Sequence, residues 1–251
     1  MFRRIFATAL GAGIGVGLLL AALQHVALVP MILEAEKYER QGETPKQATI
    51  SADQREIRNA VADIVPALAV VGRAHAHGHE ATTSDELPWR AVWTTIATTL
   101  TSVGFALLLA GAFAVSGREV TARDGVLWGL AGFAAFSLAP AFGLPPELPG
   151  AVAVDLWARQ LWWIGTVAMT ALGLGLIVFG RAAWVVVPGL VVIAVPHLIG
   201  APHSGSGAGS APPELAAAFA ARSLVIGAIF WSVLGWSAGA LYARLGRVEA
   251  A

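Results

Sequence analysis

The sequence predicts an all-α fold, a polytopic membrane helical bundle of about six transmembrane helices. Hydrophobic residues make up 57% of the 251 residues and charged residues only 13%, whereas a soluble domain has about 45–50% and about 25%. The apolar residues gather into long runs, each about long enough to cross a bilayer as a helix. Short segments with arginine, glycine or proline separate the runs. A count of five spans also fits this pattern, and residues 1–251 form one integral-membrane domain.

The first predicted span covers residues 5–30 and follows two arginines. It is longer than the apolar core of a secretory signal and no convincing cleavage site follows it, so we expect an uncleaved transmembrane helix. The span contains two overlapping GxxxG pairs, Gly11/Gly15 and Gly13/Gly17. Because glycine has no side chain, such pairs let a neighbouring membrane helix approach closely.

Five further spans are expected after a long polar segment, residues 31–89, which we predict to be an outer-face loop. The second span is rich in threonine, whose hydroxyls in lipid normally hydrogen-bond neighbouring helices but could instead line a polar path. Trp162 and Trp163 are expected to anchor the fourth span at the membrane interface. The five spans lie at about 91–115, 125–142, 161–180, 182–199 and 215–241.

The short segments on one side of the predicted bundle contain arginine. With six spans both termini lie on the same side, and the short segments of that side carry seven of the fourteen arginines. Because short cytoplasmic segments are enriched in Lys and Arg, we predict that this side, with both termini, is cytoplasmic. The residues concerned are Arg3, Arg4, Arg118, Arg123, Arg181, Arg244 and Arg247.

Composition and motifs exclude several classes of function. A formal net charge of zero argues against a nucleic-acid partner. The sequence contains no cysteine, so any metal would be held by His and by Asp or Glu rather than by thiolates. It also lacks HExxH, GxSxG, a phosphate loop and any carboxylate well inside a span. We therefore predict neither an enzyme nor a nucleotide-hydrolysing pump.

The histidines indicate binding of a divalent metal, because all six fall on the predicted outer side. Three of them alternate in the sequence HAHGHE, and in an extended segment alternate side chains share one face. Imidazole and carboxylate suit Co, Ni, Cu and Zn. The same stretch could be a solvated polar tip that binds metal only adventitiously. The candidate collecting residues are His75, His77, His79 and Glu80.

The remaining histidines lie where predicted helices meet the outer side. His25 is near the outer end of the first span, where an ionisable residue is a functional candidate or a neutral hydrogen-bonding group between helices. His197 and His203 each follow a proline around the end of the fifth span. They could present imidazoles at the mouth of the bundle or cap helix carbonyls. Glu34 and Asp155 are candidate carboxylate ligands.

Blocks along nearly the whole chain resemble one known family. They are LEAEKYE (33–39), HAHGHE (75–80), APAFGLPPELPG (139–150), ARQLWW (158–163) and PHLIGAPH (196–203). These blocks are similar to those of the probable cobalt transporter subunit CbtA family. The resemblance implies a multi-pass protein of the bacterial inner membrane, implicated in cobalt uptake connected with cobalamin synthesis. It also implies a small single-span companion with its own histidine cluster, CbtB.

The residues and the resemblance together lead to one expected function and one rival. We expect a membrane subunit that captures Co²⁺ with outer-face histidines and passes it across the bundle, with no tightly bound cofactor. Ni²⁺ or Zn²⁺ would bind such nitrogen and oxygen ligands at least as well. Expected partners are membrane lipid, the metal ion and a CbtB-like subunit, with oligomerisation an open alternative. The rival is a membrane metal-sensing or assembly protein that binds metal without transporting it.

Overall fold

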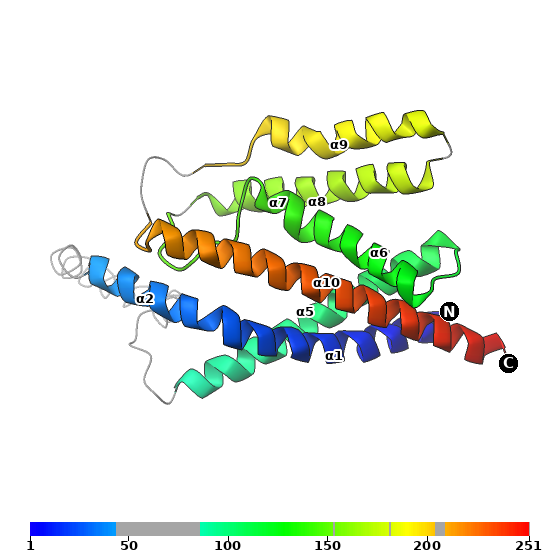
Figure 1. The fold of residues 1–251 in the computed structure, drawn as a ribbon, viewed down its shortest axis with the longest axis horizontal. Helices are drawn as coiled ribbons and strands as arrows, with labels where there is room; N and C mark the ends of the chain where they lie inside the picture. The colour runs from blue at the N-terminus through cyan, green and yellow to red at the C-terminus, as the bar shows by residue number, and fades with distance from the viewer. Residues whose placement is uncertain (44–85, 153, 181, 204–208, 251) are drawn as a thin grey trace, which may run out of the picture.

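A computed structural model describes the chain at residues 1–43, 86–152, 154–180, 182–203 and 209–250. Every regular element in these ranges is a helix, which confirms the predicted fold class. Figure 1 shows that the long helices run back and forth along the molecule and that both termini lie at the same end of the bundle. The collecting stretch predicted at residues 75–80 lies outside the described residues.

The helices follow the predicted spans with changes at their ends. They are α1 (Phe2–Ala27), α2 (Val29–Glu43), α5 (Glu86–Ser116), α6 (Ala122–Phe133), the π-helix η1 (Ala134–Leu138), α7 (Ala139–Ala141), α8 (Leu156–Phe179), the 3₁₀ helix η2 (Ala183–Val185), α9 (Val186–Ile199) and α10 (Pro213–Ala250). The third span is thus a continuous helical segment of three elements, α6, η1 and α7. The segment begins at Ala122 and is capped by Thr121, whose hydroxyl accepts a hydrogen bond from the amide of Asp124 in a capping box.

In the described part of the chain, five helices are long and apolar enough to cross a membrane: α1, α5, the α6–α7 segment, α8 and α10. The sixth predicted span is a shorter apolar helix, Ala183–Ile199. At about 1.5 Å per α-helical residue and about 2.0 Å per 3₁₀ residue, η2 and α9 together rise about 27 Å, slightly less than a hydrocarbon core of about 30 Å. Figure 1 shows α9 running antiparallel beside α8. Among the described residues, the number of helices long enough to cross a membrane is therefore five, the lower of the two predicted numbers. The helix α9 is a shorter apolar helix that runs beside α8.

Glycines allow close contacts between helices. α1 packs mainly on α5, α6 on α10, and α8 on α9. The close approach predicted at Gly13 and Gly17 is confirmed, because a Cβ at Gly13 would lie 2.5 Å from the Cα of Val103 and one at Gly17 would lie 2.7 Å from the Cα of Thr99. A Cβ at Gly15 would have no neighbour within 4 Å among the described residues. Only one of the two predicted glycine pairs therefore meets α5.

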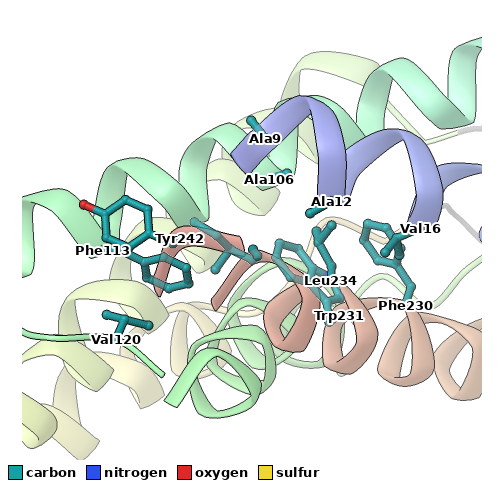
Figure 2. Close-up of a cluster of buried hydrophobic side chains, with 12 residues drawn as sticks. Ala9, Ala12, Val16, Ala106, Phe113, Val120, Phe230, Trp231, Leu234 and Tyr242 are labelled. Carbon is teal, nitrogen blue, oxygen red and sulfur yellow. The ribbon is translucent and has the colours of Figure 1, made fainter. Parts of the chain in front are cut away.

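The main core lies where α1, α5 and α10 meet, with α6 beside them. Figure 2 shows its large side chains stacked along α10, including Tyr242, Leu234 and Trp231. Phe113 of α5 is fully buried and contacts the ring of Tyr242 edge to face, with centroids 5.6 Å apart. Phe230 and Trp231 make a second edge-to-face contact at 5.6 Å. Aromatic rings in such geometry add packing energy to the burial itself.

The hydroxyls of α5 serve mainly its own backbone and one neighbouring helix. Thr95, Thr99 and Thr101 each donate to the carbonyl four residues earlier, at 2.8 Å. Thr98 donates to the side-chain oxygen of Gln24 on α1 at 3.1 Å. Of the two readings of this threonine-rich span, these bonds favour helix packing over a polar path.

Residues 31–89, predicted as a loop, begin and end in helix. Residues 31–43 belong to α2 and residues 86–89 to α5. The chain continues as a helix past Pro30 because a proline in the first turn of a helix sacrifices no intrahelical hydrogen bond. Glu36 of α2 pairs with Arg90 of α5 at 2.8 Å, which ties the two ends of the segment together.

Candidate functional site

Two of the predicted site residues, His197 and His203, line the same cavity. The cavity has a volume of about 710 Å³ and lies between the η1–α7 segment on one side and α8 and α9 on the other. His197 belongs to the last turn of α9 and is half-buried, whereas His203 follows that helix and is exposed. The structure therefore brings together the two imidazoles that the sequence placed at the mouth of the bundle.

Two aromatic rings hold the imidazole of His197. Phe142 and Trp162 each meet it edge to face, with ring centroids 6.0 Å away. The indole Nε1 of Trp162 also donates a hydrogen bond to the carbonyl of Pro196, at 3.1 Å. Trp162 thus joins α8 to the end of α9 and fixes the residue next to His197. The sequence predicts Trp162 only as a membrane-interface anchor, and nothing in the pattern indicates its contact with α9.

A proline and a glycine shape the end of α9. Pro196 lies inside the helix and has no amide hydrogen, so it donates no bond to the carbonyl four residues earlier. Gly200 ends the helix with φ of 87°, a backbone conformation that residues with a side chain rarely adopt, and its amide donates to the Pro196 carbonyl at 3.1 Å. The chain then turns along the cavity wall through Ala201, which is buried, to His203.

The opposite wall of the cavity contains a π-helical turn. Ala134 and Leu138 of η1 and Ala139 of α7 all line the cavity. A π turn inserts an extra residue into a helix, and such turns occur frequently at functional sites. Pro140 follows at once and donates no backbone hydrogen bond. Both walls are therefore helices with an interrupted hydrogen-bond ladder, a feature found at the ion sites of many transporters.

His25 lies on α1 and is not among the residues that line this cavity. Its Nδ1 is 2.7 Å from the carbonyl of Ala21, so this nitrogen donates along the helix and the other ring nitrogen is left for another partner. This bond lies within α1, so it is not the contact between helices that was the alternative expectation for His25. His25 and His197 do not form one site.

The two candidate carboxylate ligands are on other parts of the surface. Asp155 caps the first turn of α8, where its Oδ1 accepts from the amide of Ala158 at 2.8 Å. Glu34 is exposed on α2. Within the described ranges, no group of three or more His, Asp or Glu residues is arranged to hold a metal ion. The described part of the cavity therefore offers two imidazoles and no complete coordination shell.

A second cavity of about 600 Å³ lies on the other side of the η1–α7 wall. Ser137, Pro140 and Ala141 face it, whereas the first cavity is lined by neighbouring residues of the same segment. An ion pair between Glu147 and Arg159, at 2.9 Å, forms part of its lining. The sequence gives no signal for this pair, because the two charges lie in different segments of the chain.

The helices and the cavity define a polytopic membrane protein that carries imidazoles in a cavity between its helices. The family described as "Probable cobalt transporter subunit (CbtA)" matches residues 2–243, nearly the whole chain, and the chain belongs to that family. The resemblance noted in the sequence blocks is thereby confirmed. Neither a curated protein nor a solved structure matches the chain.

Proposed function

We propose that this protein is the membrane subunit through which a bacterial cobalt-uptake system moves Co²⁺ across the inner membrane. The observation that carries this proposal is the family match over residues 2–243, whose description names a probable cobalt transporter subunit. A membrane helical bundle is the architecture that such a role requires. The word subunit implies a further component, and we propose a small single-span protein with its own histidines, similar to CbtB, for that part.

The cavity between η1–α7 and α8–α9 is the proposed route for the ion. It contains the imidazoles of His197 and His203, and neutral imidazole is a common ligand of divalent transition metals. Two imidazoles with no third protein ligand among the described residues would leave most of the ion's coordination positions to water. Such a site would bind an ion weakly enough to release it, which conduction requires.

Capture from dilute solution is assigned to the outer loop. The proposed collecting residues are His75, His77, His79 and Glu80. Their alternation and their place on the predicted outer side support this role, as does the arginine-rich composition of the opposite side. An ion released from the loop would reach the exposed His203 before the half-buried His197.

Accumulation of radioactive cobalt tests this proposal directly. Cells would express the chain alone, with its small companion, or with neither, and membrane insertion would be verified in each case. Uptake above that of empty cells would support transport, and competition by Ni²⁺ and Zn²⁺ would rank the ions. If the inserted chain accumulates no cobalt with or without the companion, the transport proposal fails and the sensing or assembly role takes its place.

A further inference from the structure

One residue that lines the histidine-lined cavity carries a buried hydroxyl. Thr170 of α8 is 3% exposed and lines the cavity together with His197 and His203. Its Oγ1 has no hydrogen-bond partner among the residues that the structure describes. Thr170 lies 14 residues beyond Leu156, the first residue of α8, so it is about 21 Å along that helix.

The missing partner is unusual, because a threonine in a helix can bond its own backbone. Thr166, one turn earlier on α8, donates to the carbonyl of Trp162 at 2.8 Å. A buried hydroxyl without a partner is unfavourable, since it gives up its bonds to water. Thr8, Ser102 and Ser223 also have buried hydroxyls without a partner among the described residues. Thr8 and Ser102 line neither cavity, and Ser223 lines the second cavity rather than the one with the histidines. Among the described residues, only Thr170 combines an unpaired hydroxyl with a position in the wall that holds the imidazoles.

The inner end of the cavity closes just beyond Thr170. A Cβ at Gly173, about one turn further along α8, would lie 2.5 Å from the carbonyl oxygen of Gly189 on α9 and 2.5 Å from Cγ1 of Ile193. The backbones of α8 and α9 therefore touch here, and the remaining lining residues at this depth, Leu174 and Ile193, are apolar. An ion that entered past the histidines would have Thr170 as its last polar side chain before the closure.

We propose that Thr170 is the inner binding position for the hydrated divalent cation, its side chain turning toward the cavity so that Oγ1 accepts a hydrogen bond from a metal-bound water. This inference rests on the proposed transport function and names a residue that holds the ion after the histidines. Because the hydroxyl lies beside the closed end, its loss affects the step that moves the ion onward. Capture at the outer face does not depend on it.

Kinetics of cobalt uptake test the role of the hydroxyl. Thr170→Val keeps the shape and removes the hydroxyl, Thr170→Ser keeps the hydroxyl, and Thr166→Val is the matched control because the hydroxyl of Thr166 is already bonded to its own helix. We expect Thr170→Val to lower the maximal rate about tenfold, the effect of one hydrogen bond to a charged group, with little change in the half-saturating cobalt concentration. Thr170→Ser should retain most of the rate, and Thr166→Val should behave like the unaltered protein. An unchanged maximal rate in Thr170→Val would overturn the inference while leaving the proposed transport function intact.

Thiol labelling tests the same position without relying on transport. The chain contains no cysteine, so Thr170→Cys introduces a single thiol that a small membrane-impermeant thiosulfonate can reach only through water. We expect labelling of Thr170→Cys from outside intact cells and none of Thr166→Cys, with His203→Cys at the exposed end as the positive control. Labelling of His203→Cys without labelling of Thr170→Cys would overturn the inference, even if cobalt uptake is normal. Conversely, labelling of Thr170→Cys together with no cobalt uptake by the unaltered chain would contradict the transport proposal and leave a water-filled cavity.

Discussion

Gly173→Ala tests whether α8 and α9 really close the inner end of the cavity. The added Cβ would lie 2.5 Å from the carbonyl oxygen of Gly189, whereas atoms in comfortable contact are about 3.5 Å apart. The helices would therefore have to separate by about 1 Å, and overpacking of this kind costs about 1–3 kcal/mol. Gly175→Ala is the matched control, because a Cβ there would meet nothing within 4 Å in the described structure. Both changes share the gain in helix propensity, so the difference between them isolates the contact.

The assay is thermal unfolding of the two purified variants in the same detergent. A stability difference of about 1 kcal/mol shifts the midpoint of a protein of this size by about 2–4 °C. Gly173→Ala should therefore unfold about 2–12 °C below Gly175→Ala. Equal midpoints for the two variants would refute the reasoning, since they would mean that α8 and α9 are not in backbone contact at Gly173.

Three further outcomes are expected. Replacing the three loop histidines by alanine should lower cobalt uptake mainly when the metal is scarce, and an equal loss at saturating metal would contradict a collecting role. His197→Ala should reduce the maximal uptake rate in a normally inserted protein, and unchanged kinetics would reduce His197 to a structural residue at the helix end. Trp162→Phe keeps a ring beside His197 but removes the bond to the carbonyl of Pro196, so it should destabilise the protein by about 0.5–1.5 kcal/mol in thermal unfolding; no loss would mean that this bond does not hold α9. The loop residues changed in the first experiment are His75, His77 and His79.

Hydropathy predicted the membrane helices well because a span must satisfy its own backbone and face lipid with apolar side chains. Hydropathy was less informative about where helices begin and end, because a residue such as proline is compatible with either a helix end or a helix start. Pro30 can end a helix or occupy the first turn of the next, and the structure shows the second outcome, with α2 running to Glu43. The π turn at residues 134–138 has no comparable signature in the sequence, since its alanines and phenylalanine suit an ordinary helix equally well.

The candidate site was only partly predictable, because a cavity depends on which helix faces meet. The prolines and histidines of the PHLIGAPH block were visible in the sequence, and His197 and His203 do share a cavity. His25 does not line this cavity, since it lies on α1, which packs mainly on α5 and α10. Thr170 has no sequence signal at all. Thr170 becomes a candidate because its hydroxyl is unpaired among the described residues and because the residue lines the histidine cavity. Both facts depend on how α8 packs.

The position of the cavity follows from how unevenly the bundle is packed. The buried aromatic cluster joins α1, α5 and α10, and α6 is locked to α10 where a Cβ at Gly125 or Gly129 would collide with the α10 backbone. By contrast, α9 packs mainly on α8, and α8 meets the rest of the bundle chiefly at η1 and α7. Only 17% of the apolar stretch of α8 is buried, against 39% for α1 and for α10. The histidine-lined cavity thus lies at the boundary between a well-packed core and a thinly attached α8–α9 hairpin (Figure 1). Regions with few buried contacts open at the lowest free-energy cost, so this boundary is where the described bundle should open most easily.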